Sequence, residues 1–185
     1  ATSEGKAVDT SMGFTPQEGV MMGTRCGSID PTILPYLIKS EGYAPEQLEE
    51  IINKKSGFLG VSGVSNDTRE VTVAAKNGNK RAALSINIFV NGIKKYIGGY
   101  AAEMNGLDVL VFTAGIGEND ANIRSLVCRN MDFLGIKIDE ERNLNFKRGE
   151  EFEITAEGAG VRTFIIPTNE ELMIAMDTKK LVAKG

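Results

Sequence analysis

The sequence predicts an α/β domain in which helices cover a central mixed sheet. Short apolar segments alternate with longer amphipathic segments along the chain, which is the pattern of α/β proteins. The longest periodic segment, residues 79–104, places apolar residues three and four positions apart, as in one long helix packed on a sheet. Residues 107–112 then form an apolar run short enough for a buried strand, and this strand ends at a glycine-rich turn.

Capping residues, glycine and proline divide the rest of the chain into shorter elements. Asp30 and Pro31 are typical of the N-cap and first residue of a helix. Pro45 starts a second helix, which reaches residue 55 and is followed by Gly57. The remaining expected elements are a strand at 6–10, a loop at 60–67, a helix at 120–130, strands at 151–155 and 162–166, and a helix at 169–182.

Length, composition and charge indicate an ordinary globular protein. A chain of 185 residues fits one domain that buries roughly 70% of its unfolded surface. A net charge of −4 argues against nucleic-acid binding, which needs a basic face. No apolar run approaches the ~20 residues that span a bilayer, and residues 1–15 lack a signal-peptide pattern. The isolated Cys26 and Cys128 indicate a reducing compartment. We therefore expect a cytoplasmic protein that binds neither nucleic acid nor membrane.

The sequence contains no histidine. The commonest general base and the commonest transition-metal ligand are therefore missing. Chemistry would have to use carboxylates, Lys, Arg, backbone amides and a hard metal such as magnesium. Phosphoryl transfer suits this inventory, because it depends mainly on positioning and charge neutralisation.

The glycine-rich turn after the 107–112 strand is a candidate anion site. Gly115 and Gly117 would let the backbone approach a ligand, and the free N–H groups of a following helix would face its negative charge. In the alternative interpretation, the glycines only form the bend.

Three segments together resemble the acetate kinase family, which includes acetate and propionate kinases and belongs to the sugar kinase, Hsp70 and actin superfamily. They are residues 9–31, beginning DTSMGFTP; residues 112–119, FTAGIGEN; and residues 167–172, PTNEEL. The resemblance extends over essentially the whole chain. It implies an actin-like, ribonuclease H-like domain whose first strand is missing. Residues 1–185 would then be the C-terminal nucleotide-binding domain, with the N-terminal domain absent.

The resemblance gives Arg25 a catalytic role, the stabilisation of charge in the transition state. A permanently charged, bidentate guanidinium suits that role, although a lone loop arginine is most often a solvated surface residue. Pro16 matches the proline that lines the pocket for the substrate methyl group, and it could also serve simply as a turn residue.

Two further segments are implied to bind the nucleotide. Asp67, Thr68 and Arg69 match a triplet beside the adenosine, where the family usually has Phe or Met in place of Thr68, so the apolar wall there is weakened. Asp67 also fits a plain helix N-cap. The second segment lies after the 107–112 strand and comprises Gly115, Ile116, Gly117, Glu118 and Asn119.

Glu170 matches a glutamate that the family associates with magnesium. Mg²⁺ takes one or two carboxylates together with waters and substrate phosphates, so one glutamate is chemically sufficient. An acidic residue at the start of a helix also needs no function.

The expected function is therefore that of the C-terminal part of an acetate kinase. Such an enzyme converts ATP and acetate to ADP and acetyl phosphate by direct, magnesium-dependent in-line transfer. The isolated chain is expected to be inactive, and the family resemblance implies a homodimer. The alternatives are a fragment of a propionate kinase, a non-catalytic nucleotide-binding or dimerisation module, and an unrelated α/β binding domain.

Overall fold

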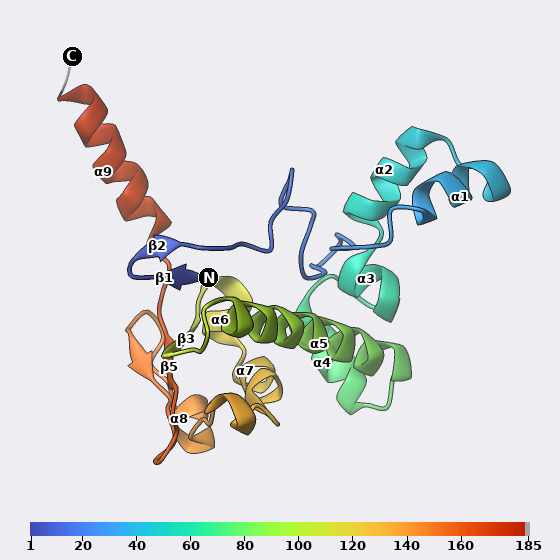
Figure 1. Ribbon diagram of the computed structural model, residues 1–185. Coiled ribbons are helices and arrows are strands. Elements are labelled where there is room, and N and C mark those ends of the chain that lie inside the picture. Colours follow the sequence, from blue (N-terminus) through green and yellow to red (C-terminus); the bar gives the residue numbers. More distant parts are fainter. Residues whose placement is uncertain (184–185) are drawn as a thin grey trace. The chain divides into compact units, whose positions relative to one another are not determined.

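The computed structural model describes residues 1–183, and the chain divides into two compact units, Ala1–Gly106 and Leu107–Gly185 (Figure 1). Among the described residues, no helix is both long enough and apolar enough to cross a membrane.

The first unit opens with a small hairpin of β1 (Thr2–Ser3) and β2 (Lys6–Ala7), which pair antiparallel. Glu4 and Gly5 form its turn with φ angles of 51° and 75°, a region that Gly adopts easily. The strand expected at 6–10 is therefore shorter than predicted. An irregular segment without helix or strand follows as far as residue 32.

Five helices complete the first unit, and two of them correct the prediction. The first helix begins at Ile33 because Asp30 accepts from the backbone N–H of Thr32 at 2.8 Å and closes a separate turn before it. Part of the loop expected at 60–67 is helical. The helices are α1 (Ile33–Glu41), α2 (Pro45–Lys54), α3 (Gly57–Ser62), α4 (Thr68–Lys76) and α5 (Lys80–Glu103).

The core of the first unit lies where α3 and α4 pack on α5. Phe58 of α3 is fully buried, and its ring centroid lies 5.0 Å from that of Phe89 on α5. Burial of Phe58 explains why α3 forms despite its two glycines, since packing outweighs weak helix propensity. The long helix predicted at 79–104 is confirmed by α5, which Asn79 caps by accepting from the N–H of Ala82 at 3.0 Å.

The second unit is built on a three-stranded sheet in the order β3-β5-β4. Its strands are β3 (Val109–Phe112), β4 (Phe152–Glu153) and β5 (Arg162–Ile165). β3 pairs with β5 in parallel and β4 pairs with β5 antiparallel, so the predicted mixed sheet is confirmed. The expectation of a buried strand at residues 107–112 is wrong for two of these residues, because Val109 and Val111 of β3 are 43% and 42% exposed.

Helices accompany this sheet, and α7 contributes buried residues to the core of the second unit. They are α6 (Ala114–Asn119), α7 (Ala121–Cys128), the 3₁₀ turn η1 (Asp132–Leu134), α8 (Glu140–Leu144) and α9 (Glu170–Val182). Ile123 and Val127 of α7 are buried together with Ile165 of β5. The glycine turn is itself helical, as α6, and α8 has no counterpart in the prediction. The side chains of α9 are exposed along its length.

Candidate active site

Arg25 lies on a tight turn in the irregular segment before α1. The N–H of Met22 donates to the carbonyl of Arg25 at 3.0 Å and closes the turn. The side chain is exposed, and none of residues 1–183 pairs with its guanidinium. A cation presented in this way can bind an anion through several N–H donors without first breaking a native ion pair.

Glycines on both sides of Arg25 allow the backbone to pack closely there. Gly27 has φ of 71°, and a Cβ on it would lie 2.6 Å from the carbonyl of Gly19. A Cβ on Gly23 would lie 2.9 Å from the carbonyl of Asn66. These contacts leave no room for a side chain, so the turn needs glycine at both positions.

Pro16 is exposed and lies on the same irregular segment as Arg25. The neighbouring Gln17 donates from Nε2 to the carbonyl of Ile52 and to Sγ of Cys26, both at 3.0 Å. Gln17 thus ties the Pro16 segment to the turn that carries Arg25. Sequence reasoning did not single out Gln17, because its partners are distant in the chain.

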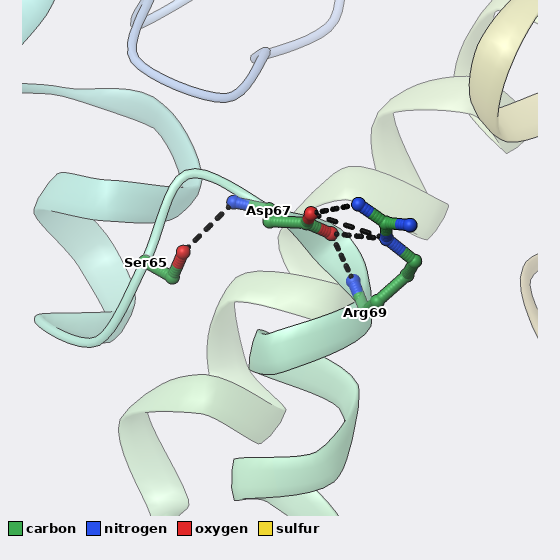
Figure 2. Close-up of polar contacts among 3 residues, drawn as sticks. All are labelled: Ser65, Asp67 and Arg69. Carbon is green, nitrogen blue, oxygen red and sulfur yellow. Dashed lines mark hydrogen bonds and ion pairs between the residues drawn. The ribbon is translucent and has the colours of Figure 1, made fainter.

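The side chains of Asp67 and Arg69 contact each other at the start of α4 (Figure 2). Asp67 accepts from the backbone N–H of Arg69 at 2.8 Å, which confirms the predicted N-cap, and it also pairs with the Arg69 guanidinium. The Arg69 side chain, followed by its backbone N–H, lowers the pKa of Asp67 to about 2. Asp67 is therefore ionised at neutral pH, and Arg69 stays largely exposed for further contacts.

The first unit brings its candidate residues toward one another. Gly23 packs against the carbonyl of Asn66, immediately before Asp67. The turn of Arg25 therefore lies against the loop that leads into α4. Thr68, the first residue of α4, is half-buried.

In the second unit, the two glycines of the FTAGIGEN segment differ in their surroundings. A Cβ on Gly115 would meet nothing within 4 Å, whereas one on Gly117 would lie 3.3 Å from the backbone of Phe112. Ala114, and neither glycine, adopts the left-handed conformation, with φ of 58°. Close packing on β3 therefore accounts for glycine at position 117, while the space beside Gly115 is open.

Glu118 and Asn119 use their side chains to brace the same turn. Glu118 accepts from the N–H of Ala114 and from the N–H of Thr168, both at 2.8 Å, and Asn119 donates to the carbonyl of Gly115 at 2.9 Å. The N–H of Thr168, with help from its hydroxyl and from Ala114, lowers the pKa of Glu118. Glu118 thus joins the FTAGIGEN and PTNEEL segments, 50 residues apart.

Arg124 is a further site residue that sequence reasoning missed. Its side chain is fully buried and donates to the carbonyls of Gly117 and Glu118 at 2.9 Å and to Oδ1 of Asn143 at 2.7 Å. Burial lowers its pKa to about 10, so it remains charged at neutral pH. The sequence did carry one signal of this burial, since Arg124 lies beside Ile123 and Val127 on the apolar face of α7.

Glu170, the expected magnesium residue, is the first residue of α9 and is exposed. Asn169 caps the helix by accepting from the N–H of Leu172 at 3.1 Å, so the Glu170 carboxylate is not needed as the cap. None of residues 1–183 pairs with that carboxylate, and none of them forms a cluster of three metal-binding side chains. One free hard oxygen ligand fits a magnesium ion carried mainly by substrate phosphates.

A family model described as the acetokinase family matches residues 1–176. The chain belongs to the acetokinase family. Acetate kinase from Moorella thermoacetica is 59% identical over 98% of the chain, and acetate kinase 2 from Clostridium perfringens is 55% identical over all of it. The chain spans only 45% and 46% of the lengths of these two relatives, and it corresponds to the C-terminal part.

Solved structures of this acetokinase family confirm the predicted actin-like fold class. The chain is similar to the crystal structure of Porphyromonas gingivalis acetate kinase, with a TM-score of 0.89 and 50% identity over 96% of the chain and 44% of that protein. It is also similar to a propionate kinase from Francisella tularensis, with a TM-score of 0.87 and 43% identity over 95% of the chain and 44% of that protein.

The bridge at Glu118 predicts a pH dependence within this acetokinase unit. The pKa of Glu118 is lowered below 4.5 in the folded state. The ionised carboxylate therefore stabilises the fold at pH values above the pKa of the unfolded state, and this stabilisation is lost as the pH falls through the folded-state pKa. We expect the amide resonance of Thr168 to titrate with a midpoint below 4.5, and Glu118→Gln to remove this titration. A midpoint at or above 4.5 would contradict the bridge.

Proposed function

We propose that this chain is the nucleotide-binding C-terminal part of an acetate kinase, which transfers the γ-phosphoryl group of ATP to acetate. The observation that carries the proposal is Arg25, whose unpartnered guanidinium stands exposed on a turn held by glycines. Phosphoryl transfer needs a fixed cation where negative charge is spread over the transferring group. Arg25 would supply that cation, and the nearby Pro16 would line the pocket for the methyl group of acetate.

Each unit carries residues that we assign to the nucleotide. Arg69 keeps an exposed guanidinium beside the capping carboxylate of Asp67, and Thr68 would border the adenosine. In the second unit, Gly115 offers unobstructed backbone, and Ile116, Gly117, Glu118 and Asn119 complete the turn. The internal bonds of Glu118 and Asn119 support a role in holding the shape of this turn.

Magnesium would be held by Glu170 together with the phosphates of the nucleotide. When bound, the ion would supply positive charge to the phosphate oxygens. Two residues of the chain would position the substrates. Arg25 would orient the acceptor and the transferring group, and Gly115 would allow the nucleotide to approach the backbone of α6 closely.

Transfer to propionate is the second candidate function. The similarity to a propionate kinase structure favours it, at 43% identity, while the acetate kinases named above are 50–59% identical. We therefore propose acetate as the preferred substrate. The ratio of kcat/KM for the two acids decides between them, and a higher value for propionate would reverse the assignment.

The proposed function can be tested in a chimera in which this chain follows the upstream residues of the Moorella thermoacetica enzyme. The chimera should form acyl phosphate from ATP, magnesium and acetate, with turnover in the kinase range of about 1–100 s⁻¹. The chain alone should form none, because part of the substrate clamp is missing. An inactive chimera, or an active isolated chain, would contradict the proposal. The homodimer and the cytoplasmic location expected from the sequence stay predictions.

The nucleotide site is tested by Gly115→Val in the same chimera. Since a Cβ on Gly115 would meet nothing within 4 Å, the variant is expected to fold normally and to block only the ligand. We expect the affinity for ADP to fall at least tenfold, measured by calorimetry. Gly99→Val is the control, because that glycine of α5 likewise has nothing within 4 Å of its missing Cβ and no positive φ, and it lies outside the proposed site. Unchanged affinity in Gly115→Val would remove Gly115 from the nucleotide site.

A further inference from the structure

We propose that the junction between α2 and α3 positions Arg25 for catalysis, and that Gly57 is the residue that makes this possible. The inference rests on the proposed function and extends it to a residue outside the three motif segments. It concerns the first unit alone, where the junction and the Arg25 turn are in direct contact.

The start of α3 binds one side of the turn. The backbone N–H groups of Ser56, Phe58 and Leu59 donate at 2.9 Å to three successive carbonyls of the turn, those of Thr24, Met22 and Gly23 in that order. The first N–H groups of a helix have no partner within the helix and must find one elsewhere. Here the turn supplies those partners, so the beginning of α3 and the turn are fixed by the same bonds.

The end of α2 binds the other side of the turn. The carbonyl of Ile52 accepts from the N–H of Cys26 at 2.9 Å, and the carbonyl of Asn53 accepts from the hydroxyl of Thr24 at 2.9 Å. These are carbonyls of the last turn of α2, which likewise lack a partner within their helix. Both residues that flank Arg25 are therefore attached to α2.

Gly57 lies at the point of closest approach between the junction and the turn. Its φ is 61°, which L side chains rarely adopt. A Cβ on Gly57 would overlap the carbonyl oxygen of Met22 and lie 2.8 Å from the carbonyl oxygen of Arg25. Because the atoms in the way are backbone, a side chain at Gly57 has to displace the turn itself.

The junction cannot easily move away instead. Phe58, the next residue, is fully buried, and its ring packs on that of Phe89 in α5. Close-packed cores resist displacement. The strain created at Gly57 is therefore expected to move the exposed Arg25 turn, and a displacement of about 1 Å can reduce a rate by 10².

The test compares Gly57→Ala with Gly42→Ala in the chimeric kinase. Gly42 has a similar φ of 71° but open space around its missing Cβ, so it controls for backbone strain alone. Gly57→Ala should lower kcat by about 10–100-fold and leave the KM for ATP within about threefold, since no nucleotide contact is assigned to the Arg25 turn itself. Gly42→Ala should keep the parent kcat.

A double-mutant cycle separates positioning from general damage. If Gly57 acts through Arg25, the double variant Gly57→Ala/Arg25→Ala should have a kcat within twofold of that of Arg25→Ala alone, because the guanidinium that Gly57 positions is already absent. If the loss of kcat in the double variant equals the product of the losses in the two single variants, the proposal is overturned.

A milder variant keeps the proposal testable if Gly57→Ala does not fold. Thr24→Val removes the hydroxyl that donates to Asn53, and Thr24→Ser keeps it. We expect kcat to fall about three- to tenfold in Thr24→Val and to recover in Thr24→Ser, again with little change in the KM for ATP.

Two outcomes identify which idea has failed. An active parent whose Gly57→Ala variant matches Gly42→Ala in kcat, or whose Thr24→Val variant matches the parent, would overturn the positioning role alone. A parent that forms no acyl phosphate would overturn the proposed function, and the positioning role would fall with it.

Discussion

Replacing Arg25 with alanine in the chimeric kinase is expected to lower kcat by about 10²–10³, the usual loss when a donor aimed at developing charge is removed. The native structure should tolerate the change, because the side chain is exposed and none of residues 1–183 pairs with it. The KM for ATP should change little, since the expected nucleotide contacts lie elsewhere. Steady-state kinetics with saturating ATP, and with acetate as the varied substrate, measure the effect.

Arg25→Lys should recover only part of this loss. An ammonium retains the charge but does not reproduce the planar pair of N–H donors. Arg148→Ala serves as the control, because Arg148 is an exposed arginine outside the candidate site. A lysine variant with full activity, or an alanine variant within threefold of the parent, would exclude a role in the transition state.

Replacing Arg124 with alanine is expected to cost about 3–5 kcal/mol of unfolding free energy. The variant would leave a cavity at a fully buried position. It would also deprive the carbonyls of Gly117 and Glu118 and the amide of Asn143 of a donor, and a buried polar group without a partner costs about 1–3 kcal/mol. Urea unfolding of parent and variant, followed by circular dichroism, measures the difference.

Arg124→Lys should not restore stability, since one ammonium cannot span acceptors that lie on α6 and α8. Arg162→Ala is a suitable control, because its ion pair with Glu153 lies at the surface, where such pairs contribute little to stability. A loss below about 1 kcal/mol in Arg124→Ala would show that α6 does not depend on this side chain.

The elements predicted best are those specified by neighbouring residues. The long helix α5 follows from apolar residues repeated every three or four positions, and the cap at Asp67 needs only the backbone N–H of Arg69, two residues away. The three motifs likewise identify the acetokinase family from contiguous residues, as the family match over residues 1–176 confirms. Such signals lie within a short window of sequence, so they can be interpreted before the chain is folded.

Two of the predictions that failed involve contacts between distant residues. α3 forms because Phe58 packs on Phe89, 31 positions away by residue number, and no local signal predicted it. The exposure of Val109 and Val111 depends on which elements cover β3, whereas their apolar character alone suggested a buried strand.

The sequence by itself determined the family, the order of the main helices and strands, and the candidate residues Arg25, Asp67, Arg69 and Gly115–Asn119. Only the tertiary structure decided which of these positions are exposed, which are packed, and which hydrogen-bond partners they have. Gly115 faces open space while Gly117 packs on β3, Glu118 bridges to Thr168, Arg124 is buried beneath α6, and Gly57 touches the turn of Arg25. A residue's type limits what it can do, but its partners are fixed by long-range packing that brings distant segments into contact.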